Sequence, residues 1–382
     1  MRVKADIKLP QDVIDISDAY IKAGKDIFLV GGVIRDFLKQ TKAKDYDLVT
    51  NALPEESKRI LKDFNVSDEQ GKNFGVLRVF TKDEPLGYEI ASYRKDISLG
   101  RDTKGDDAKV EMGSHITIED DCMRRDLTVN ALFYDIKTKE IVDIVGGIED
   151  IKNGVVRAVG NASERFKEDR LRILRVFRFS SRIGGVIDFE TFNAIKSDNR
   201  LKGISEKDDV SQERIWDEFN KAFSQSKDFN VFLKLLTDFD MWEQIFPGVN
   251  INTELINSKD FLIVITNLFK NEVSSRELET KLIQEFKIEA DTAKKVIFLL
   301  SMLSMKVEDV FTFYKKKLQC SISNEEILEW LKVSKINDFR NKFVNFYTPS
   351  ISSKELMDQG IAGRDLGIKL NELEIENFKR ML

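Results

Sequence analysis

The stretch "VGGVIRDFLKQTKAKDYDLVT", residues 30–50, decides how the first part of this chain is interpreted. It continues the apolar run "IFLV", which is typical of a buried strand, and a helical pattern follows the glycines. A strand that ends at Gly31 and Gly32 before a helix directs backbone N–H groups and the positive end of the helix dipole to one spot, where anions bind. Arg35, on the first helical turn, adds a guanidinium group that suits a triphosphate. For two glycines alone, a plain tight turn is the alternative.

Two aspartates follow in the same stretch. Because alternate side chains of a strand share a face, Asp45 and Asp47 are expected to point the same way. Two neighbouring carboxylates repel each other unless a cation lies between them, and Mg²⁺ prefers oxygen ligands. Such a pair can hold two ions about 3.5–4 Å apart, one activating an attacking hydroxyl and one neutralising a leaving pyrophosphate. Glu89, on a later strand, is the expected third carboxylate unless it is a solvated strand residue; Asp135 and Asp143 are the alternatives.

Composition and charge exclude several classes of protein. With 382 residues, 42% of them hydrophobic and 33% charged, the chain is expected to be a multidomain globular protein. The single histidine, His115, excludes sites that need two imidazoles, and Cys122 and Cys320 form no CxxC pair, so neither a disulfide framework nor a cysteine zinc site is expected. A net charge of −5 argues against uniform electrostatic capture of nucleic acid but allows a local basic face. We find no signal peptide or membrane span in the sequence and expect a cytoplasmic protein.

The pattern of elements changes along the chain. Up to about residue 150, short β-rich runs predict an α/β or α+β domain, including a strand over 127–136. From about residue 161, long amphipathic stretches with few turn residues predict an all-helical remainder. The glycine-rich, charged segment 100–113 is expected to be a mobile loop inside the first domain.

Five motifs occur in order over residues 27–220. They are "GGVIRD…DYDLVT" (31–50), "RRDLTVNAL" (124–132), "DIVGGIED" (143–150), "EDRLRILRVFRF" (168–179) and "ERIWDEF" (213–219). With this set, the chain resembles the class II tRNA nucleotidyltransferases, or CCA-adding enzymes, and the related bacterial poly(A) polymerases of the polymerase β superfamily. A less specific similarity to the tail of these enzymes lies in "LMDQGIAGRDLGIKLNELE" (356–374).

The resemblance implies an α+β protein with four parts. Its catalytic head would be a polymerase β-like nucleotidyltransferase domain with a mixed sheet and helices, and the neck, body and tail would be all-helical. The neck would recognise the nucleotide base, and the tail would bind tRNA. The expected parts are the head (1–150), neck (151–222), body (223–310) and tail (311–382).

The second motif has a basic pair before a strand. Arg124 and Arg125 could meet phosphates or ribose there, and Asp126 could orient one of them; in the family, this motif contacts the sugar. A surface basic pair is the alternative. All three are expected nucleotide-binding residues.

The fourth motif carries the base selection. If Asp169 and Arg172 lie on one helix, they are three residues apart and therefore neighbours. One acceptor beside one donor matches the edges of cytosine and adenine and mismatches uracil and guanine, so no nucleic-acid template is required. Arg175 and Arg178 continue the series and belong to the family's pattern, but each step of three drifts about 60° around the helix, which places Arg178 nearly opposite Asp169. A charged helix with internal ion pairs is the alternative.

Two further motifs have structural interpretations. The glycines of "DIVGGIED" stand at the junction between the β-rich and helical regions, where either a hinge or a plain turn is compatible. In the fifth motif, Arg214 and Glu218 form an i,i+4 pair that can brace the neighbouring helix.

The resemblance implies template-independent, Mg²⁺-dependent addition of C, C and A to the tRNA 3′ end from CTP and ATP, with the acceptor arm as the RNA partner. "EDRLR" lacks the proline that poly(A) polymerases of the group usually show after Glu–Asp, and a loop suitable for ATP incorporation precedes the second motif. Its sequence matches no known family form, so the switch from C to A stays open. The alternatives are A-only or poly(A) addition and, in another class, a non-catalytic RNA-binding protein. The oligomeric state is not determined by the sequence.

Overall fold

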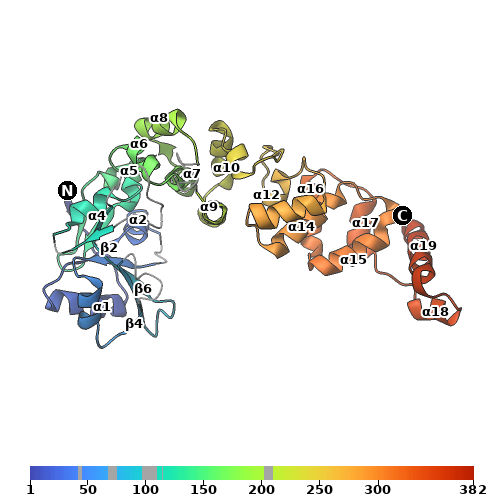
Figure 1. Ribbon diagram of the computed structural model, residues 1–382, viewed down its shortest axis with the longest axis horizontal. Helices are drawn as coiled ribbons and strands as arrows, with labels where there is room; N and C mark the ends of the chain where they lie inside the picture. Colours follow the sequence, from blue (N-terminus) through green and yellow to red (C-terminus); the bar gives the residue numbers. More distant parts are fainter. Residues whose placement is uncertain (42–44, 68–74, 97–109, 114, 202–209) are drawn as a thin grey trace. The chain divides into compact units, whose positions relative to one another are not determined.

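A computed structural model describes most of the chain. The described residues are 1–41, 45–67, 75–96, 110–113, 115–201 and 210–382. Their contacts divide the chain into two units, Met1–Leu235 and Leu236–Leu382 (Figure 1). The expected boundaries at 150, 222 and 310 remain predictions. The segment 100–113 lies mostly outside the described residues, and its last part is a short strand rather than a loop, because β8 (Val110–Met112) pairs with β7 (Arg94–Asp96).

A mixed sheet forms the base of the first unit. Among the described residues its order is β1 (Arg2–Lys4), β10 (Glu140–Asp143), β9 (Leu132–Asp135), β2 (Ile27–Val30), β3 (Asp47–Thr50), β6 (Tyr88–Ser92), β5 (Val76–Phe80) and β4 (Asn65–Ser67). Neighbouring strands are antiparallel except β3 and β6, which are parallel. All four residues of β2 are buried, as its uninterrupted apolar run predicts. The expected mixed sheet is confirmed.

Short helices accompany the strands of this sheet. They are α1 (Gln11–Lys22), α2 (Gly32–Leu38), α3 (Pro54–Ile60), α4 (Ile118–Met123) and α5 (Gly147–Asn153). One part of the core contains Phe28, Val30, Val49 and Phe133, with Phe28 and Phe133 packed edge to face at 6.4 Å between ring centroids. These side chains come from β2 and from the strands on both sides of it, so the core fixes the end of β2 from which the chain enters the glycine turn.

Two predicted strands are shorter than expected. The run 127–136 gives only β9, because Thr128–Asn130 form a turn of 3₁₀-helix. That turn buries the polar side chain of Asn130. Strand β3 begins at Asp47, so Asp45 precedes the strand, and the alternation expected for the two aspartates does not apply.

The first unit continues with helices and a two-stranded parallel sheet. These elements are β11 (Val155–Val156), α6 (Ala162–Glu168), α7 (Leu171–Ile183), β12 (Val186–Ile187), α8 (Phe189–Ser197), α9 (Gln212–Gln225) and most of α10 (Phe229–Asp238), whose last residues belong to the second unit. Helix α7 buries Ile173, Leu174, Val176 and Phe177 and packs against α9. This region is therefore mainly helical, and both β11 and β12 are exceptions to the all-helical neck expected over 151–222.

All regular elements of the second unit are helical. It contains α11 (Trp242–Ile245), α12 (Phe261–Leu268), α13 (Arg276–Thr280), a π-helical turn (Lys281–Glu285), α14 (Ala290–Met302), a 3₁₀ turn (Val307–Asp309), α15 (Val310–Cys320), α16 (Asn324–Val333), α17 (Phe339–Phe346), α18 (Ser353–Asp358) and α19 (Gly363–Met381). Its core includes Phe246, Phe269 and Phe286, and the indole of Trp330 donates to the carbonyl of Leu299 at 2.7 Å. No helix in the described ranges has the length and apolar character to cross a membrane.

Candidate active site

The glycine turn of the opening stretch connects β2 directly to α2. Gly31 caps the helix with φ of +68°, a conformation that favours glycine, and the helix begins at Gly32. The Arg35 side chain lies under this turn, since a Cβ at Gly32 would be 3.4 Å from its Nη2 atom. It is only 3% exposed, and its Nη1 donates to Oδ1 of Asn130 at 2.6 Å. Burial, with the nearby Arg182, lowers the pKa of Arg35 to about 10. The guanidinium group of Arg35 therefore lies beside the turn, as expected, but it is buried and hydrogen-bonded to Asn130.

The carboxylates lie on neighbouring strands. Strands β3 and β6 are parallel with Leu48 opposite Ile90, so Asp47 and Glu89 precede those partners and share one face of the sheet. The Asp47 side chain is open to solvent, but the surrounding protein partly desolvates its carboxylate. This desolvation and the negative charges of Glu89 and Asp45 raise the pKa of Asp47 to about 6, although the positive charge of Arg125 opposes the shift. The structure therefore brings the three predicted carboxylates into one electrostatic group.

The donor set suits a hard divalent cation, because all three groups offer carboxylate oxygens. Glu89 forms an ion pair with Arg78 across the β5–β6 pair. In the parts of the chain that the structure describes, no three acidic, histidine or cysteine side chains converge closely enough to hold a metal ion. Asp45 and Asp47 are therefore the candidate ligands, and Glu89 would have to leave Arg78 to join them.

The two alternative third carboxylates have other roles. Asp143 accepts hydrogen bonds from four backbone N–H groups at 2.8–3.2 Å in the loop that leads into α5. Asp135 accepts from two backbone N–H groups in the β9–β10 turn, and it lies opposite Phe28 on β2, away from the glycine end of that strand. These backbone partners favour Glu89 over Asp135 and Asp143 as the third carboxylate.

The arginine pair of the second motif is held by a carboxylate that the sequence analysis missed. Asp121 is fully buried, and its two oxygens accept from Arg124 Nε at 2.8 Å and from Arg125 Nη2 at 2.9 Å. Burial opposes ionisation of Asp121, but the two guanidinium groups outweigh it and lower its pKa. Arg125 also lies 4.8 Å from the ring centroid of Phe133. The spacing of Asp121 three and four residues before the arginines, at one end of α4, was the available signal.

Asp126 and Arg175 connect the second and fourth motifs. Arg175 Nε donates to Asp126 Oδ2 at 2.7 Å, and Asn130 Nδ2 donates to Asp126 Oδ1 at 3.2 Å. Burial acts to raise the pKa of Asp126, but Arg175 and the hydrogen bonds prevail and lower it to about 2. Asn130, which the sequence analysis did not single out, thus bridges Arg35 and Asp126. Arg175 therefore lies beside the second motif, and its contact with a nucleotide stays a prediction.

Asp169 and Arg172 do not lie on one helix, contrary to expectation. Helix α6 ends at Glu168, and Asp169 is an extended residue between α6 and α7. Its oxygens accept from the N–H of Leu171 at 3.1 Å and from Arg214 Nη2 at 2.8 Å. Arg172, in the first turn of α7, donates to Glu168 at 2.8 Å and to the backbone carbonyl of Arg124 at 3.1 Å. The start of α7 thus carries an acceptor, Asp169, and a donor, Arg172, and each is held by different partners.

Arg178 is buried and contacts other side chains of the protein. It is 4% exposed, donates from Nε to Glu218 at 2.6 Å, and lies 4.4 Å from the ring centroid of Phe179. The expected Arg214–Glu218 pair is wrong, because Arg214 contacts Asp169 while Glu218 turns toward α7. The fifth motif still braces the neighbouring helix α7, because Glu218 accepts from Arg178. Arg178 is held by Glu218 and by the ring of Phe179, and its expected contact with a nucleotide stays a prediction.

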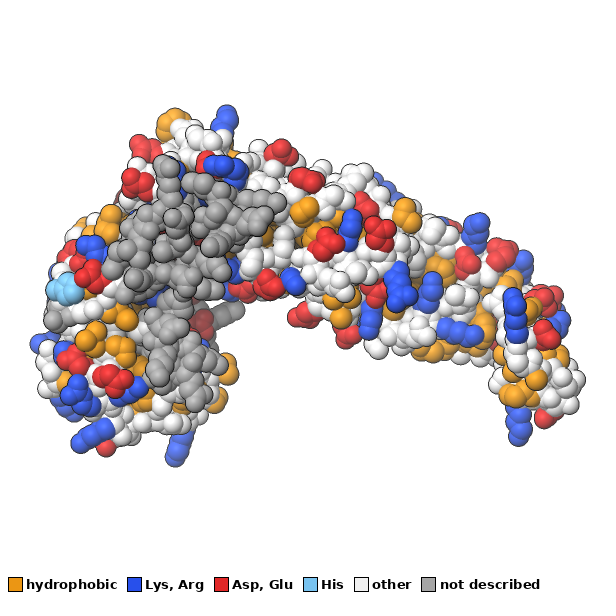
Figure 2. Space-filling model, in the orientation of Figure 1, with side chains coloured by type: hydrophobic (Ala, Val, Ile, Leu, Met, Phe, Trp, Pro, Cys, Tyr) orange, Lys and Arg blue, Asp and Glu red, His pale blue; other side chains and the backbone are white. Residues whose placement is uncertain are grey.

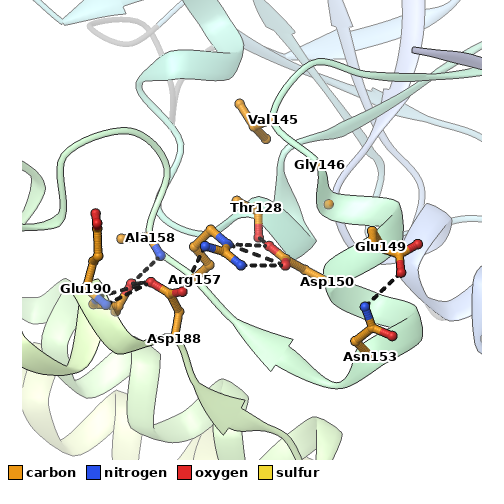
Figure 3. A network of polar contacts seen from close by, with 12 residues as sticks. Thr128, Val145, Gly146, Glu149, Asp150, Asn153, Arg157, Ala158, Asp188 and Glu190 are labelled. Atoms are coloured by element: carbon orange, nitrogen blue, oxygen red, sulfur yellow. Dashed lines mark hydrogen bonds and ion pairs between the residues drawn. The ribbon is translucent and has the colours of Figure 1, made fainter.

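A network of polar contacts lies beside the glycines of the third motif (Figure 3). Thr128 donates to Asp150 at 2.6 Å, and Arg157 links Asp150 to Asp188, with its Nη1 at 2.8 Å from the latter. A Cβ at Gly147 would lie 2.2 Å from the backbone oxygen of Thr128. The adjoining cavity, about 140 Å³, is too small for a nucleotide. These contacts favour a tight turn over a hinge.

Two segments of the chain match models of known protein families. Residues 27–157 match the family model of the poly A polymerase head domain, and residues 186–252 match the model described as the probable RNA and SrmB-binding site of polymerase A. Together these matches cover about half of the chain. The first match contains the glycine turn, the three carboxylates and the arginine pair.

Curated relatives and solved structures agree with these models. The chain is 42% identical over 180 residues to the CCA-adding enzyme of Ligilactobacillus salivarius. This alignment covers 47% of this chain and 42% of that enzyme. Identity to the CCA-adding enzyme of Pediococcus pentosaceus is 28% over 389 residues, 96% of this chain and 94% of that enzyme. The CTP complex of the Bacillus stearothermophilus CCA-adding enzyme has the same fold, with a TM-score of 0.69, 22% identity, and coverage of 95% of this chain and 91% of that one.

The extent of these matches differs. The chain spans less than half the length of the first curated relatives it matches. The head-domain and RNA-binding models nevertheless occur in order, and the structural match covers nearly the whole chain. Residues 27–157 of this chain therefore match the poly A polymerase head-domain family, and nearly the whole chain has the fold of the CCA-adding enzymes.

Proposed function

We propose that this protein is a CCA-adding tRNA nucleotidyltransferase that uses CTP and ATP and needs no template. The observation that carries the proposal is the register of β3 and β6, which sets Asp47 beside Glu89 next to the glycine turn. The near full-length similarity to a CCA-adding enzyme supports addition of C and A over other nucleotidyl transfers.

Nucleotidyltransferases of this family use a divalent metal ion, and we assign Mg²⁺ to Asp45 and Asp47, with Glu89 as the third carboxylate. When bound, Mg²⁺ lowers the pKa of the attacking RNA 3′-hydroxyl and neutralises the leaving pyrophosphate. The N–H groups at the start of α2, beginning with that of Gly32, bind the triphosphate, with Arg35 below them. Gly31 shapes the turn, because its own N–H donates to the carbonyl of Leu132 at 3.3 Å. The sheet holds these groups in place before substrate arrives, so little reorganisation accompanies the reaction.

The remaining nucleotide contacts come from the second and fourth motifs. Arg124 and Arg125, oriented by Asp121, meet the phosphates or ribose, and Asp126 and Arg175 lie behind them. Asp169 accepts from the exocyclic amine of cytosine or adenine, and Arg172 donates to the ring nitrogen. Uracil and guanine would leave these partly buried groups unpaired, which accounts for selection by the protein alone.

We assign the acceptor arm of tRNA to the helical parts of the chain. Residues 1–150 act as head, 151–222 as neck, 223–310 as body and 311–382 as tail. On the face shown in Figure 2, lysine and arginine side chains of the second unit are interspersed with acidic ones, so recognition by RNA shape and scattered phosphate contacts suits it better than one basic patch. The cytoplasm is the proposed compartment.

Extension of tRNA with one nucleotide at a time tests this function. A transcript without CCA should gain two C residues from CTP alone, and one ending in CC should gain a single A from ATP. UTP and GTP should add little, and Asp47→Asn should abolish extension of both transcripts. No incorporation of CTP or ATP by the wild-type protein contradicts the proposal.

The head-domain model is named for poly A polymerase, which keeps poly(A) or A-only addition as a second candidate. It predicts incorporation of ATP without any use of CTP, as a long tract or a single residue respectively. A non-catalytic RNA-binding protein is the third candidate, and it predicts that Asp45→Ala leaves function unchanged.

A further inference from the structure

Cationic side chains gather where the C-terminal ends of α2 and α7 meet. Lys39, at the end of α2, donates from Nζ to the carbonyl of Ile183 at 3.4 Å. The backbone N–H of Lys227 donates to the carbonyl of Ser181 at 3.2 Å, which places this lysine at the same end of α7. Arg182, in the last turn of α7, completes the group. We call Lys39, Arg182 and Lys227 the rim cluster.

The rim cluster adjoins the candidate active site. Guanidinium carbons of Arg35, Arg178 and Arg182 lie 5.2, 4.4 and 5.8 Å from the ring centroid of Phe179. Arg35 is the residue under the glycine turn. Asp45 is close enough to Arg182 to act on it electrostatically. The cluster therefore extends the positive charge of the turn along one side of the carboxylate group.

Too few carboxylates balance these charges. Asp36 lies 3.4 Å from Arg35 and 3.7 Å from Arg182, and Glu218 pairs with Arg178. Within the described residues, no carboxylate forms an ion pair with Lys39 or Lys227. Burial lowers the pKa of Lys39, and Lys227, Arg35 and Arg182 lower it further against the opposing Asp36.

A structural explanation covers part of this arrangement. Helix C-termini favour cations, and Lys39 satisfies a free carbonyl at the end of α7. That interaction needs one cation, whereas three converge here and repel one another. Unbalanced positive charge beside a site for charged substrates is the usual mark of an anion site.

We propose that Lys39, Arg182 and Lys227 bind a phosphate group, and this proposal rests on the proposed function. The ligand chemistry is a phosphate of the RNA backbone near its 3′ end or a phosphate of the incoming nucleotide. A backbone contact would hold the RNA end beside Asp45 without reading its sequence, because phosphate contacts position nucleic acids whereas base contacts specify them. The guanidinium of Arg182 offers a fork of donors, and the lysines offer compact charges.

Equilibrium binding to the full chain tests the cluster. The test variant is Lys39→Ala/Lys227→Ala, and the matched control is Lys22→Ala, an exposed lysine at the end of α1. Labelled tRNA without CCA is titrated without nucleotide or metal at several salt concentrations, and CTP is titrated separately without RNA. We expect the double variant to bind RNA about tenfold more weakly and to reduce the salt slope by about one per lost phosphate contact.

The two titrations separate the sources of phosphate. Weaker RNA binding with unchanged CTP binding assigns the cluster to the RNA backbone, and the reverse assigns it to the nucleotide. If the double variant binds RNA and CTP as well as Lys22→Ala does, the proposal is overturned. A lower melting temperature with both affinities unchanged also overturns it, because that result shows that the lysines only stabilise the helix ends. Neither titration requires turnover, so a wild-type protein that binds RNA but adds no nucleotide contradicts only the proposed function. A wild-type protein that binds neither RNA nor CTP overturns both.

Discussion

Arg175 Nε lies 2.7 Å from Asp126 Oδ2, and this contact joins α7 to the turn that follows the arginine pair. Removing one partner of such a pair leaves the other charge poorly compensated. Asp126→Asn should therefore destabilise the protein by about 3 kcal/mol, seen as a lower melting temperature of the first unit.

The effect of Asp126→Asn should depend on pH. Because the folded pKa of Asp126 is about 2, below its ordinary value, the ionised group contributes stability above about pH 4 that is lost as pH falls toward 2. The difference in melting temperature between wild type and Asp126→Asn should be full at pH 5 and shrink between pH 4 and pH 2. A difference that stays constant over this range contradicts the electrostatic account.

Asp47→Asn should have the opposite effect on stability. The pKa of Asp47 is raised to about 6, so ionisation costs stability as pH rises from about 4 to 6, and the cost persists above that range. With a chelator present, Asp47→Asn should melt higher than wild type at pH 8 and near wild type at pH 4. It should also lose the stabilisation that added Mg²⁺ gives the wild type, measured as a shift of melting temperature.

The control for Asp47→Asn is Asp18→Asn, an exposed residue on α1. It should retain the Mg²⁺ response of the wild type and its tRNA extension. If Asp47→Asn responds to Mg²⁺ as the wild type does, the assignment of Asp47 as a ligand fails.

The strand, glycine turn and helix of the opening stretch could be predicted because their signals are local. Asn130 and Arg35, by contrast, are 95 residues apart in sequence and meet only once β2 and β9 pair. The shared helix expected for Asp169 and Arg172 failed for a different reason. Spacing of three residues fits a helix, but it does not reveal that α6 ends before Asp169, whose carboxylate instead accepts from the N–H of Leu171.

Arg214→Ala should impair base selection while leaving the fold intact. Its guanidinium fixes one oxygen of Asp169 from α9, and the pair is exposed enough to contribute at most about 1 kcal/mol to stability. We expect kcat/KM for CTP and ATP to fall about tenfold, mainly through KM, and the relative incorporation of UTP and GTP to rise. Arg214→Lys should restore part of the selection.

Lys221→Ala is the control for Arg214, because Lys221 pairs with Asp217 on the same helix. Its nucleotide selection should equal that of the wild type. Unchanged selection in Arg214→Ala would show that Asp169 is positioned without Arg214.

Gly147→Ala should be far more damaging than Gly146→Ala. The new Cβ at Gly147 would meet the Thr128 backbone oxygen at 2.2 Å, and relief requires movement of the turn that carries Asn130, which should cost about 3 kcal/mol. Gly146 has φ of +84° and open space around it, so alanine there adds only backbone strain of about 1 kcal/mol. Melting temperatures of the two variants measure this difference, and extension assays below both melting points measure activity. A hinge at these glycines predicts the contrary result, in which both variants melt as the wild type does and both turn over more slowly.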